Sequence, residues 1–570
     1  MSASVPQLPE QTLQIGVIGH RALPEADMEL LTHAATQALA SMIAAARQAL
    51  PEPARAKLQL RCLSSLAEGS DCLLAEVAMA QGCSLAAPLP FQRAVYAKDF
   101  TDPVALVRHE RLLALASSVY EIDAAGAKAE SYLAASRIML AQSDIVLAIW
   151  DGEAERGIGG TAQTIREALL ADIPVVVIAA QAPHGLHVPG DSTAATPQAQ
   201  IVEWMNHLLS PAPVVKARQD ALAHYLAEPV KAAPLATWFV RGVERWLLVA
   251  ARPEPQPQNE PPPELPSSVD DPLRLFDSVV EPHRRSFDLL ATRYAALYRS
   301  AFTVRLLAVL PATAFGIISL YAAPTLANLG LSGQLLVLAV TLIIAGLDAR
   351  LGWHRRFVAY RYLAEHLRQS RLLALFGGTG ALAPPHLDRK PLPEDWADAV
   401  LRRIVRAAGL PSLNGGGGFI AAAGAIICHE MAEQRDFYLA RAAKFAVLGQ
   451  RLKVAGTVLY IAGFGFTLLR LVLGPVSHVP GLATTLALLA MIAPALSPVF
   501  FGLRSWNEYA SLSDRYLATG HRLSRLLHLY RLHPANRAKL ETIATTAAAL
   551  MLAETKEWQS AIKGHDLKPL

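Results

Sequence analysis

Residues 306–347 contain no Asp, Glu, Lys, Arg or His, and this uncharged stretch of 42 residues limits the possible folds more than any other feature of the sequence. An α-helix rises about 1.5 Å per residue, so about 20 residues cross the hydrocarbon core of a bilayer. The stretch is therefore long enough for two membrane passes. Pro324, Asn328 and Gly330 predict the turn between them.

A second apolar pair lies at residues 454–473 and 482–503, so the sequence predicts an all-α membrane domain with four transmembrane helices in two tandem hairpins. Both hairpin tips lack Lys and Arg apart from Arg470, whereas basic residues cluster at the other ends of the spans. This bias predicts a multi-pass protein of the bacterial inner membrane with both termini in the cytoplasm. The four cysteines show no zinc-ligand spacing, so we expect reduced thiols and no metal site.

The N-terminal part of the chain alternates short apolar runs with helical segments. The runs are apolar throughout, which is typical of strands that are buried on both faces of a parallel sheet. We therefore predict an α/β Rossmann-like domain over residues 1–252, with helices on both faces of the sheet. The predicted strands are residues 13–18, 58–63, 83–88, 117–122, 144–150 and 174–179.

Three polar or glycine-rich loops follow predicted strands. In such sheets ligands bind at the carboxyl ends of the strands, where glycines let the backbone approach a phosphate and a helix N-terminus favours an anion. Asp71 and Thr161 could instead cap the helices that they begin, and His20 and Arg21 could be solvated loop residues. The predicted nucleotide-binding residues are Gly19, His20, Arg21, Ser64, Ser65, Gly69, Asp71, Asp151, Gly159, Gly160 and Thr161.

The order of these segments resembles the SLOG superfamily, which includes the Lonely-guy phosphoribohydrolases, the DNA-processing protein A family and sensor domains of bacterial conflict systems. The similarity covers roughly residues 12–180. The segment SSLAEGSD is similar to an element of the DNA-processing family, and GGT is similar to an element of the phosphoribohydrolases. The resemblance implies a Rossmann-like fold that binds a nucleotide-derived ligand.

The sequence departs from the phosphoribohydrolase pattern beside the GGT element. Ala162 and Gln163 follow Thr161, so the position of that family's catalytic Glu is not acidic, and Glu167 lies one to two turns further along. Arg137 is the candidate for the family's catalytic Arg, but its spacing from the GGT element differs. We therefore expect a binding domain rather than an enzyme.

The membrane part contains an internal repeat. Residues 360–376 align without gaps to residues 514–530 at an offset of 154, and Arg285, Phe287 and Leu289 match residues at an offset of 150. Each unit is a helix, a hairpin and a basic amphipathic helix, and both units cross the membrane in the same direction. Each resembles a SLATT domain, the two-span effector associated with SLOG domains, and residues 429–445 are the most similar segment.

The sequence accordingly divides into five parts. A nucleotide-sensing domain at 1–252 is followed by a proline-rich linker at 253–271, a first hairpin unit at 272–410, a flexible Gly-rich joint at 411–419 and a second unit at 420–570 that ends in a further helix.

Together these features predict a membrane effector that forms a pore or disrupts the membrane when it binds a nucleotide second messenger. The expected ligand is a cyclic nucleotide or a molecule derived from ADP-ribose or NAD, with no other cofactor, and the resemblance implies a role in antiphage or conflict defence. We expect membrane lipids and further copies of the chain as partners, and no nucleic acid polymer. Two alternatives stay open: a membrane-tethered nucleoside 5′-monophosphate phosphoribohydrolase and a non-enzymatic membrane scaffold.

Overall fold

The structure is a computed structural model of the 570-residue chain. The residues that it describes are 3–4, 6–122, 128–155, 157–189, 196–209, 229–230, 242, 263–321, 323–378, 396–416, 418–473, 481–506, 509–532 and 536–563.

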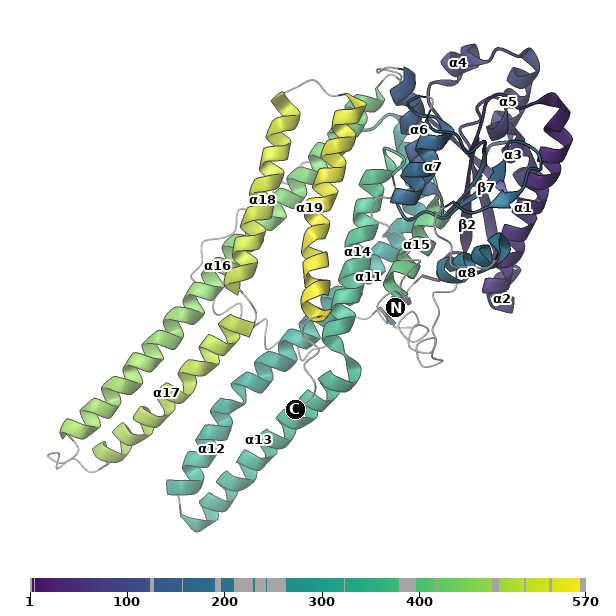
Figure 1. Ribbon diagram of the computed structural model, residues 1–570. Coiled ribbons are helices and arrows are strands. Elements are labelled where there is room, and N and C mark those ends of the chain that lie inside the picture. Colours follow the sequence, from purple (N-terminus) through teal and green to yellow (C-terminus); the bar gives the residue numbers. More distant parts are fainter. Residues whose placement is uncertain are drawn as a thin grey trace.

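A seven-stranded sheet forms the centre of the N-terminal domain, in the order β5-β4-β3-β2-β6-β7-β8 (Figure 1). All neighbouring strands are parallel except β8, which is antiparallel to β7. The six predicted strands and the parallel sheet are confirmed, whereas β8 and a separate small pair, β1 with β9, were not predicted. The strands are β1 (Ala3–Ser4), β2 (Thr12–Gly19), β3 (Gln59–Leu63), β4 (Ser84–Leu89), β5 (Ser118–Glu121), β6 (Ile145–Trp150), β7 (Val175–Ala179), β8 (Leu186–His187) and β9 (Pro229–Val230).

Helices cover both faces of this sheet, which explains why its strands are apolar throughout. Successive strand residues point to opposite faces, so Ile145 and Leu147 join one core while Val146 and Ala148 join the other. The first core includes residues of α1 (Met28–Ala49), α3 (Ser70–Ala80), α5 (Pro103–Leu115) and α8 (Pro197–Leu209), and the second includes residues of α6 (Lys128–Gln142) and α7 (Thr161–Leu170). Short helices α2 (Glu52–Arg55), α4 (Arg93–Tyr96), η1 (Glu25–Asp27) and η2 (Ala97–Asp99) lie in the connections.

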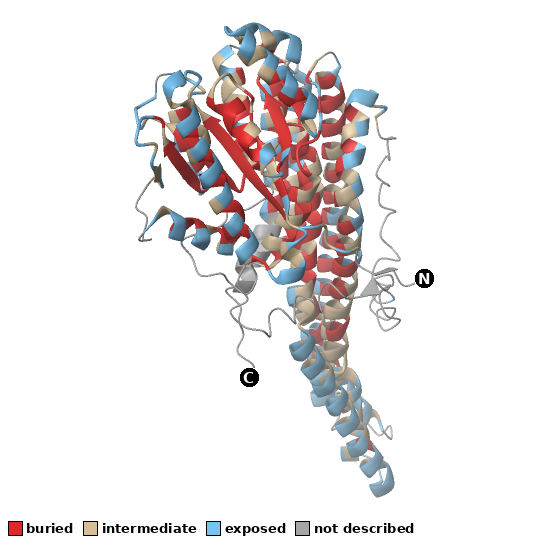
Figure 2. Ribbon diagram, turned by 90° about the vertical axis from the view of Figure 1, so that its right-hand side faces the viewer, coloured by how far each residue is buried: buried red, intermediate tan, exposed pale blue. Residues whose placement is uncertain are grey.

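Four helical stretches in the C-terminal part are long and apolar enough to cross a membrane. They form two hairpins that point in the same direction, α12 with α13 and the end of α16 with α17 (Figure 1). The hairpins are mostly exposed in the single chain (Figure 2), as expected of segments that face lipid. The helices of this part are α11 (Ser267–Leu307), α12 (Val309–Tyr321), α13 (Pro324–Leu351), α14 (Trp353–Ala374), α15 (Trp396–Ala408), α16 (Phe419–Leu473), α17 (Leu482–Trp506), α18 (Tyr509–Leu532) and α19 (Arg537–Lys563).

Two predicted boundaries are wrong. Helix α13 begins at Pro324, a residue favoured in the first turn of a helix, so Asn328 and Gly330 lie inside the helix and not in the turn. Helix α11 begins at Ser267, inside the predicted linker. Most of that linker and most of residues 210–252 lie outside the described residues.

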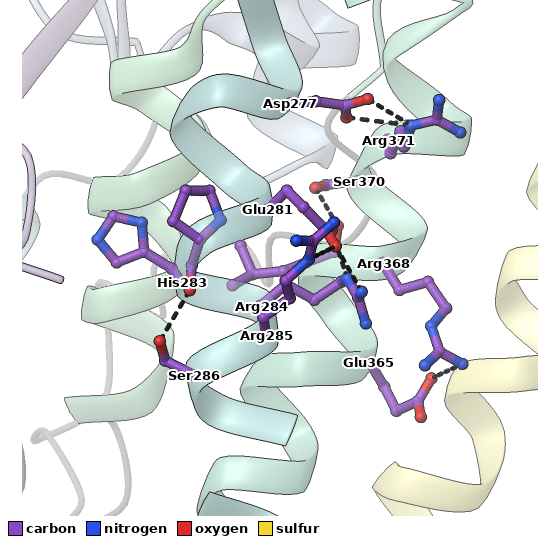
Figure 3. Close-up of polar contacts among 12 residues, drawn as sticks. Asp277, Glu281, His283, Arg284, Arg285, Ser286, Glu365, Arg368, Ser370 and Arg371 are labelled. Carbon is purple, nitrogen blue, oxygen red and sulfur yellow. Dashed lines mark hydrogen bonds and ion pairs between the residues drawn. The ribbon is translucent and has the colours of Figure 1, made fainter. Parts of the chain in front are cut away.

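The helices α11–α19 form the C-terminal helical module. An ion pair joins α11, its first long helix, to α14, the helix that follows the first hairpin (Figure 3). Arg371 of α14 donates to both carboxylate oxygens of Asp277 of α11, at 3.0 and 2.8 Å. Within α14, Glu365 is buried and lies 3.5 Å from Arg368. The pair of Arg371 with Asp277 therefore holds α14 against α11 beyond the hairpin.

The helical module docks directly on the sheet domain. Arg406 of α15 is 3 % exposed and donates to Asp144 at 2.9 Å, at the amino end of β6. Arg406 also donates to the carbonyl oxygen of Ser143, and Gln14 of β2 donates to the carbonyl oxygen of Arg406. Buried charges are found where they are paired and hydrogen-bonded, so this contact holds the module in one position against β2 and β6.

The segment after α15, which includes the predicted Gly-rich joint at residues 411–419, is hydrogen-bonded to the sheet. Glu121 of β5 donates its backbone N–H to Leu413, and Gly415 donates to the carbonyl oxygen of Glu121, each at 2.8 Å. In helix α19, Arg537 donates to the hydroxyl of Tyr120 at 2.8 Å. Both repeat units are therefore anchored on the same sheet domain.

Candidate functional site

The three predicted loops meet at one edge of the sheet. From β2 the chain continues to β3, β4 and β5 on one side, and it then returns to form β6 and β7 on the other side of β2. The strand order therefore reverses at β2. The loops after β2, β3 and β6 all leave at the carboxyl edge. A cleft forms at such a switch point because the connections on its two sides turn to opposite faces of the sheet.

A cavity of about 550 Å³ lies among these loops. Its volume is in the range of small-molecule sites in proteins, about 300–1,000 Å³. Of the predicted binding residues, Ser64 and Gly69 do not line it. Those that line it are Gly19, His20, Arg21, Ser65, Asp71, Asp151, Gly159, Gly160 and Thr161.

Ser64 and Gly69 support the loop instead. The Ser64 hydroxyl donates to the carbonyl oxygen of Asp71 and accepts from the backbone N–H of Leu66, both at 3.1 Å. Gly69 has a φ of +86°, and a Cβ there would lie 2.0 Å from the carbonyl oxygen of Arg21. Only glycine fits this close crossing of two loops.

Asp71 is the buried acid of the cavity. It is 6 % exposed and accepts a hydrogen bond from the backbone N–H of Gly19 at 3.2 Å. Burial raises the pKa of Asp71 to about 7, although backbone donors and the charge of Arg21 act in the opposite direction. Near neutral pH this group can accept or donate a hydrogen bond, which suits a ribose hydroxyl or the edge of a base.

His20 and Asp151 connect β2 to β6 across the switch point. The Nε2 atom of His20 lies 3.1 Å from both the backbone nitrogen and the Oδ1 atom of Asp151. Each of the two residues thus orients the other at the cavity wall.

On another side of the cavity, Arg21 contacts Tyr132, which is hydrogen-bonded to Asp99. Its guanidinium lies over the ring of Tyr132, 4.7 Å from the centroid, which is the geometry of a cation–π contact. The Tyr132 hydroxyl donates to Asp99, and Lys128 pairs with the same carboxylate at 2.6 Å. Burial and the Asp99 carboxylate raise the pKa of Tyr132 to about 12. Arg21 is thus oriented by an aromatic ring and carries a positive charge at the cavity.

Tyr96 is a cavity residue that the sequence did not reveal. It is 1 % exposed, and its hydroxyl has no hydrogen-bond partner among the described residues. A buried hydroxyl without a partner is costly, so this group is available for a ligand. Tyr96 ends the one-turn helix α4, which has no hydrophobic period that could have indicated it.

Helix α7 begins at the cavity and presents the amides of its first turn. Gly160 and Thr161 line the cavity, and no side chain caps the helix at Gly160. The backbone N–H of Gly159 donates to the side-chain oxygen of Gln163 at 2.8 Å. The first turn of a helix carries free N–H groups and partial positive charge, a combination that binds phosphate.

Arg137 and Glu167 lie outside this cavity. Arg137 donates to both carboxylate oxygens of Glu167 at 2.9 Å, between α6 and α7, and neither residue lines the cavity. Arg137, the candidate for the catalytic Arg of the phosphoribohydrolases, is therefore held in an exposed ion pair outside the cavity. Among the described residues, no group of three or more His, Cys, Asp or Glu side chains could hold a metal ion.

The cavity thus combines an anion-binding helix end and an oriented arginine with a buried acid and aromatic rings. No family model matches the chain, and neither a curated protein nor a solved structure matches it significantly. The likeness to the SLOG and SLATT families rests on sequence motifs alone and stays a prediction.

Proposed function

We propose that this chain is a membrane effector controlled by a nucleotide-derived ligand, which binds in the sheet domain and changes the packing of the two hairpins so that the membrane leaks. The observation that carries the proposal is the position of the cavity. It lies at the carboxyl ends of β2 and β6, and the amino ends of the same strands hold the helical module through Asp144 and Arg406.

The chemistry of the cavity supports a ligand that carries both phosphate and a ribose or base. The first turn of α7 and Arg21 offer positive potential for a phosphate. Asp71 and Tyr96 offer polar groups, and the aromatic residue Trp150 also lines the cavity. Cyclic nucleotides and ADP-ribose derivatives contain the phosphate, ribose and base groups that would bind to these residues.

Helix α6 supports a route from the cavity to the membrane module. Its first half lines the cavity through Lys128 and Tyr132. At its end, Gln142 donates to the carbonyl oxygen of Gly377 at 2.9 Å, and Arg406 donates to the carbonyl oxygen of Ala141 at 3.1 Å. A ligand that shifts α6 alters contacts with α15 and with the end of α14, which is an elementary way to couple two sites.

The proposed setting is the inner membrane of a bacterium, with the sheet domain in the cytoplasm and with defence by membrane damage as the outcome. The positive charges near the spans support this orientation. The phosphoribohydrolase alternative is weaker because Arg137 is bound to Glu167 outside the cavity.

The test is a thermal-shift screen of the full chain in detergent against cyclic di-AMP, cyclic di-GMP, cyclic tri-adenylate, NAD and ADP-ribose. The full chain is needed because a fragment of residues 1–252 would lack Arg406, which pairs with Asp144. We expect at least one compound to raise the unfolding temperature. Gly160→Asp should abolish the shift, because a carboxylate there would repel a phosphate.

The matched control is Arg137→Ala, which removes an arginine of the same domain outside the cavity. It should leave the shift unchanged. Loss of the shift in both variants, or in neither, would contradict the assignment of the cavity.

A further inference from the structure

A groove of about 560 Å³ runs along the first hairpin and is closed on one side by α17. Ala308, just before α12, and Ala312 and Gly316 of α12 line it at intervals of four residues and so lie on one helix face. Small residues in this pattern let a second helix approach closely in a membrane.

Gln334 of α13 places an amide in this groove. It lies 10 residues after Pro324 and 14 residues before Asp348, which corresponds to about 15 and 21 Å along the helix and therefore to the middle of a bilayer. The amide lies over Gly316, where a Cβ would be 3.6 Å from both its nitrogen and its oxygen. No residue that the structure describes makes a hydrogen bond with it.

The hydroxyl groups of the groove are satisfied within their own helices. The hydroxyl of Thr313 donates to the carbonyl oxygen of Val309, and that of Thr341 donates to Leu338, each at 2.7 Å. The amide of Gln334 is the exception among the described side chains of the groove.

The second hairpin differs at the matching position. The offset of 154 residues, which comes from residues 360–376 just after α13, places Leu488 at the position equivalent to Gln334, so the second unit has an apolar residue there. Its own buried polar group, Ser497, donates to the carbonyl oxygen of Gly456 at 2.9 Å and so joins α17 to α16. The second hairpin is therefore complete within one chain, and the first is not.

We propose that the groove of the first hairpin is the contact site for a second copy of this chain, with Gln334 of one copy hydrogen-bonded to the partner's Gln334. A carboxamide both donates and accepts, so a two-fold contact satisfies both groups. An acyl chain of a lipid could fill the groove, but it cannot form a hydrogen bond with an amide in hydrocarbon. The inference rests on the membrane location in the proposed function and adds the partner that the first hairpin contacts, with or without a nucleotide.

The experiment is disulfide cross-linking in native membranes, in a Cys428→Ser background because the other three cysteines are buried. Gln334→Cys should give a covalent dimer on mild oxidation without added nucleotide. Leu336→Cys is the control, since Leu336 lies about 200° further around the same helix at nearly the same depth and is 65 % exposed. It should give little dimer, and equal cross-linking at both positions, or none at position 334, would overturn the proposal.

Self-association without a cross-link is measured for the wild type, Gln334→Leu and Thr457→Val in lipid nanodiscs or dilute detergent. Thr457 of α16 lies outside the groove and its hydroxyl donates to the carbonyl oxygen of Lys453 in its own helix. Interhelical hydrogen bonds of this kind are modest, so Gln334→Leu should weaken dimerisation about three- to tenfold, whereas Thr457→Val should not. An unchanged dimer in Gln334→Leu would contradict the proposal. Both assays are independent of ligand binding, so a failed nucleotide screen would refute the proposed function and leave this contact standing.

Discussion

Two buried aspartates lie at opposite ends of the central strands, and their surroundings differ. At the amino end of β6, Asp144 accepts hydrogen bonds from Arg406 and from the backbone of Gln14. At the carboxyl edge, Asp71 accepts from the backbone of Gly19 and faces the cavity. One end is a completed contact with the helical module, whereas the other has polar groups that a ligand would complete.

The two ends of the sheet are therefore expected to have different roles, stability at the Asp144 end and ligand binding at the Asp71 end. A paired buried charge fixes geometry, and breaking the pair is strongly destabilising. A buried acid with a raised pKa beside an open cavity is typical of a binding site. The amino end should therefore respond to mutation through stability, and the carboxyl end through ligand binding and pH.

The largest expected effect comes from breaking the completed end. Arg406→Ala leaves Asp144 buried without its closest cation and should cost about 3–5 kcal/mol of stability, measured as a lower unfolding midpoint. Arg402→Ala is the matched control, because Arg402 reaches the same carboxylate from 3.3 Å and is more exposed. An equal loss in the two variants would show that Arg406 has no special role.

The cavity end should show a pH-dependent stability that arises from Asp71. The pKa of Asp71, about 7 in the folded protein, lies above its ordinary value of 3.8. Between these values the folded state keeps a proton that the unfolded state has lost, so stability falls as pH rises from about 4 to about 7 and then levels off.

Asp71→Asn removes this titration. The stability of the wild type relative to Asp71→Asn should fall by about 2.5–3 kcal/mol between pH 5 and pH 8. Thermal unfolding of both proteins across this range measures the difference. A difference that stays constant with pH would mean that Asp71 is not a protonated acid in the folded protein.

Tyr96→Phe should sharpen the contrast with a smaller effect. The substitution removes a buried hydroxyl that has no partner among the described residues, so the free protein should be unchanged or more stable by about 1 kcal/mol. Ligand binding should weaken if the hydroxyl contacts the ligand. A clear loss of stability without ligand would show that the hydroxyl already has a partner.

The smallest effect is expected for the exposed pair between α6 and α7. Arg137→Ala removes a bond to Glu167 from a side chain that is 60 % exposed, and surface pairs contribute about 0–1 kcal/mol. Both stability and ligand binding should be close to wild type. Loss of ligand binding in Arg137→Ala would show that Arg137 contributes to the binding site.

Much of the sheet domain can be predicted because its signals are local. A strand that is buried on both faces is apolar at every position, and strand ends determine where the loops of a parallel sheet emerge. Sequence reasoning therefore places the loops that carry His20, Asp71 and Thr161 at one edge of the sheet. It cannot assign the supporting roles of Ser64 and Gly69, since these depend on a crossing with another loop.

The contacts between domains could not be predicted because they join residues that are distant in sequence. Arg406 and Asp144 are separated by 262 positions, and neither lies in a motif. Tyr96 reaches the cavity from a one-turn helix whose position depends on tertiary packing. In the first hairpin, Asn328 and Gly330 indicated a turn, but the membrane environment favours a helix that satisfies its own backbone groups.

The central claim is that a ligand in the cavity controls the membrane module, and leakage from liposomes tests it most directly. The full chain is reconstituted with a trapped fluorescent dye, and the five nucleotide compounds are added from the side of the sheet domain. We predict dye release with the compound that raises the unfolding temperature, release by Arg137→Ala, and none by Gly160→Asp. Release that is the same with and without every compound, or that persists in Gly160→Asp, would contradict the account.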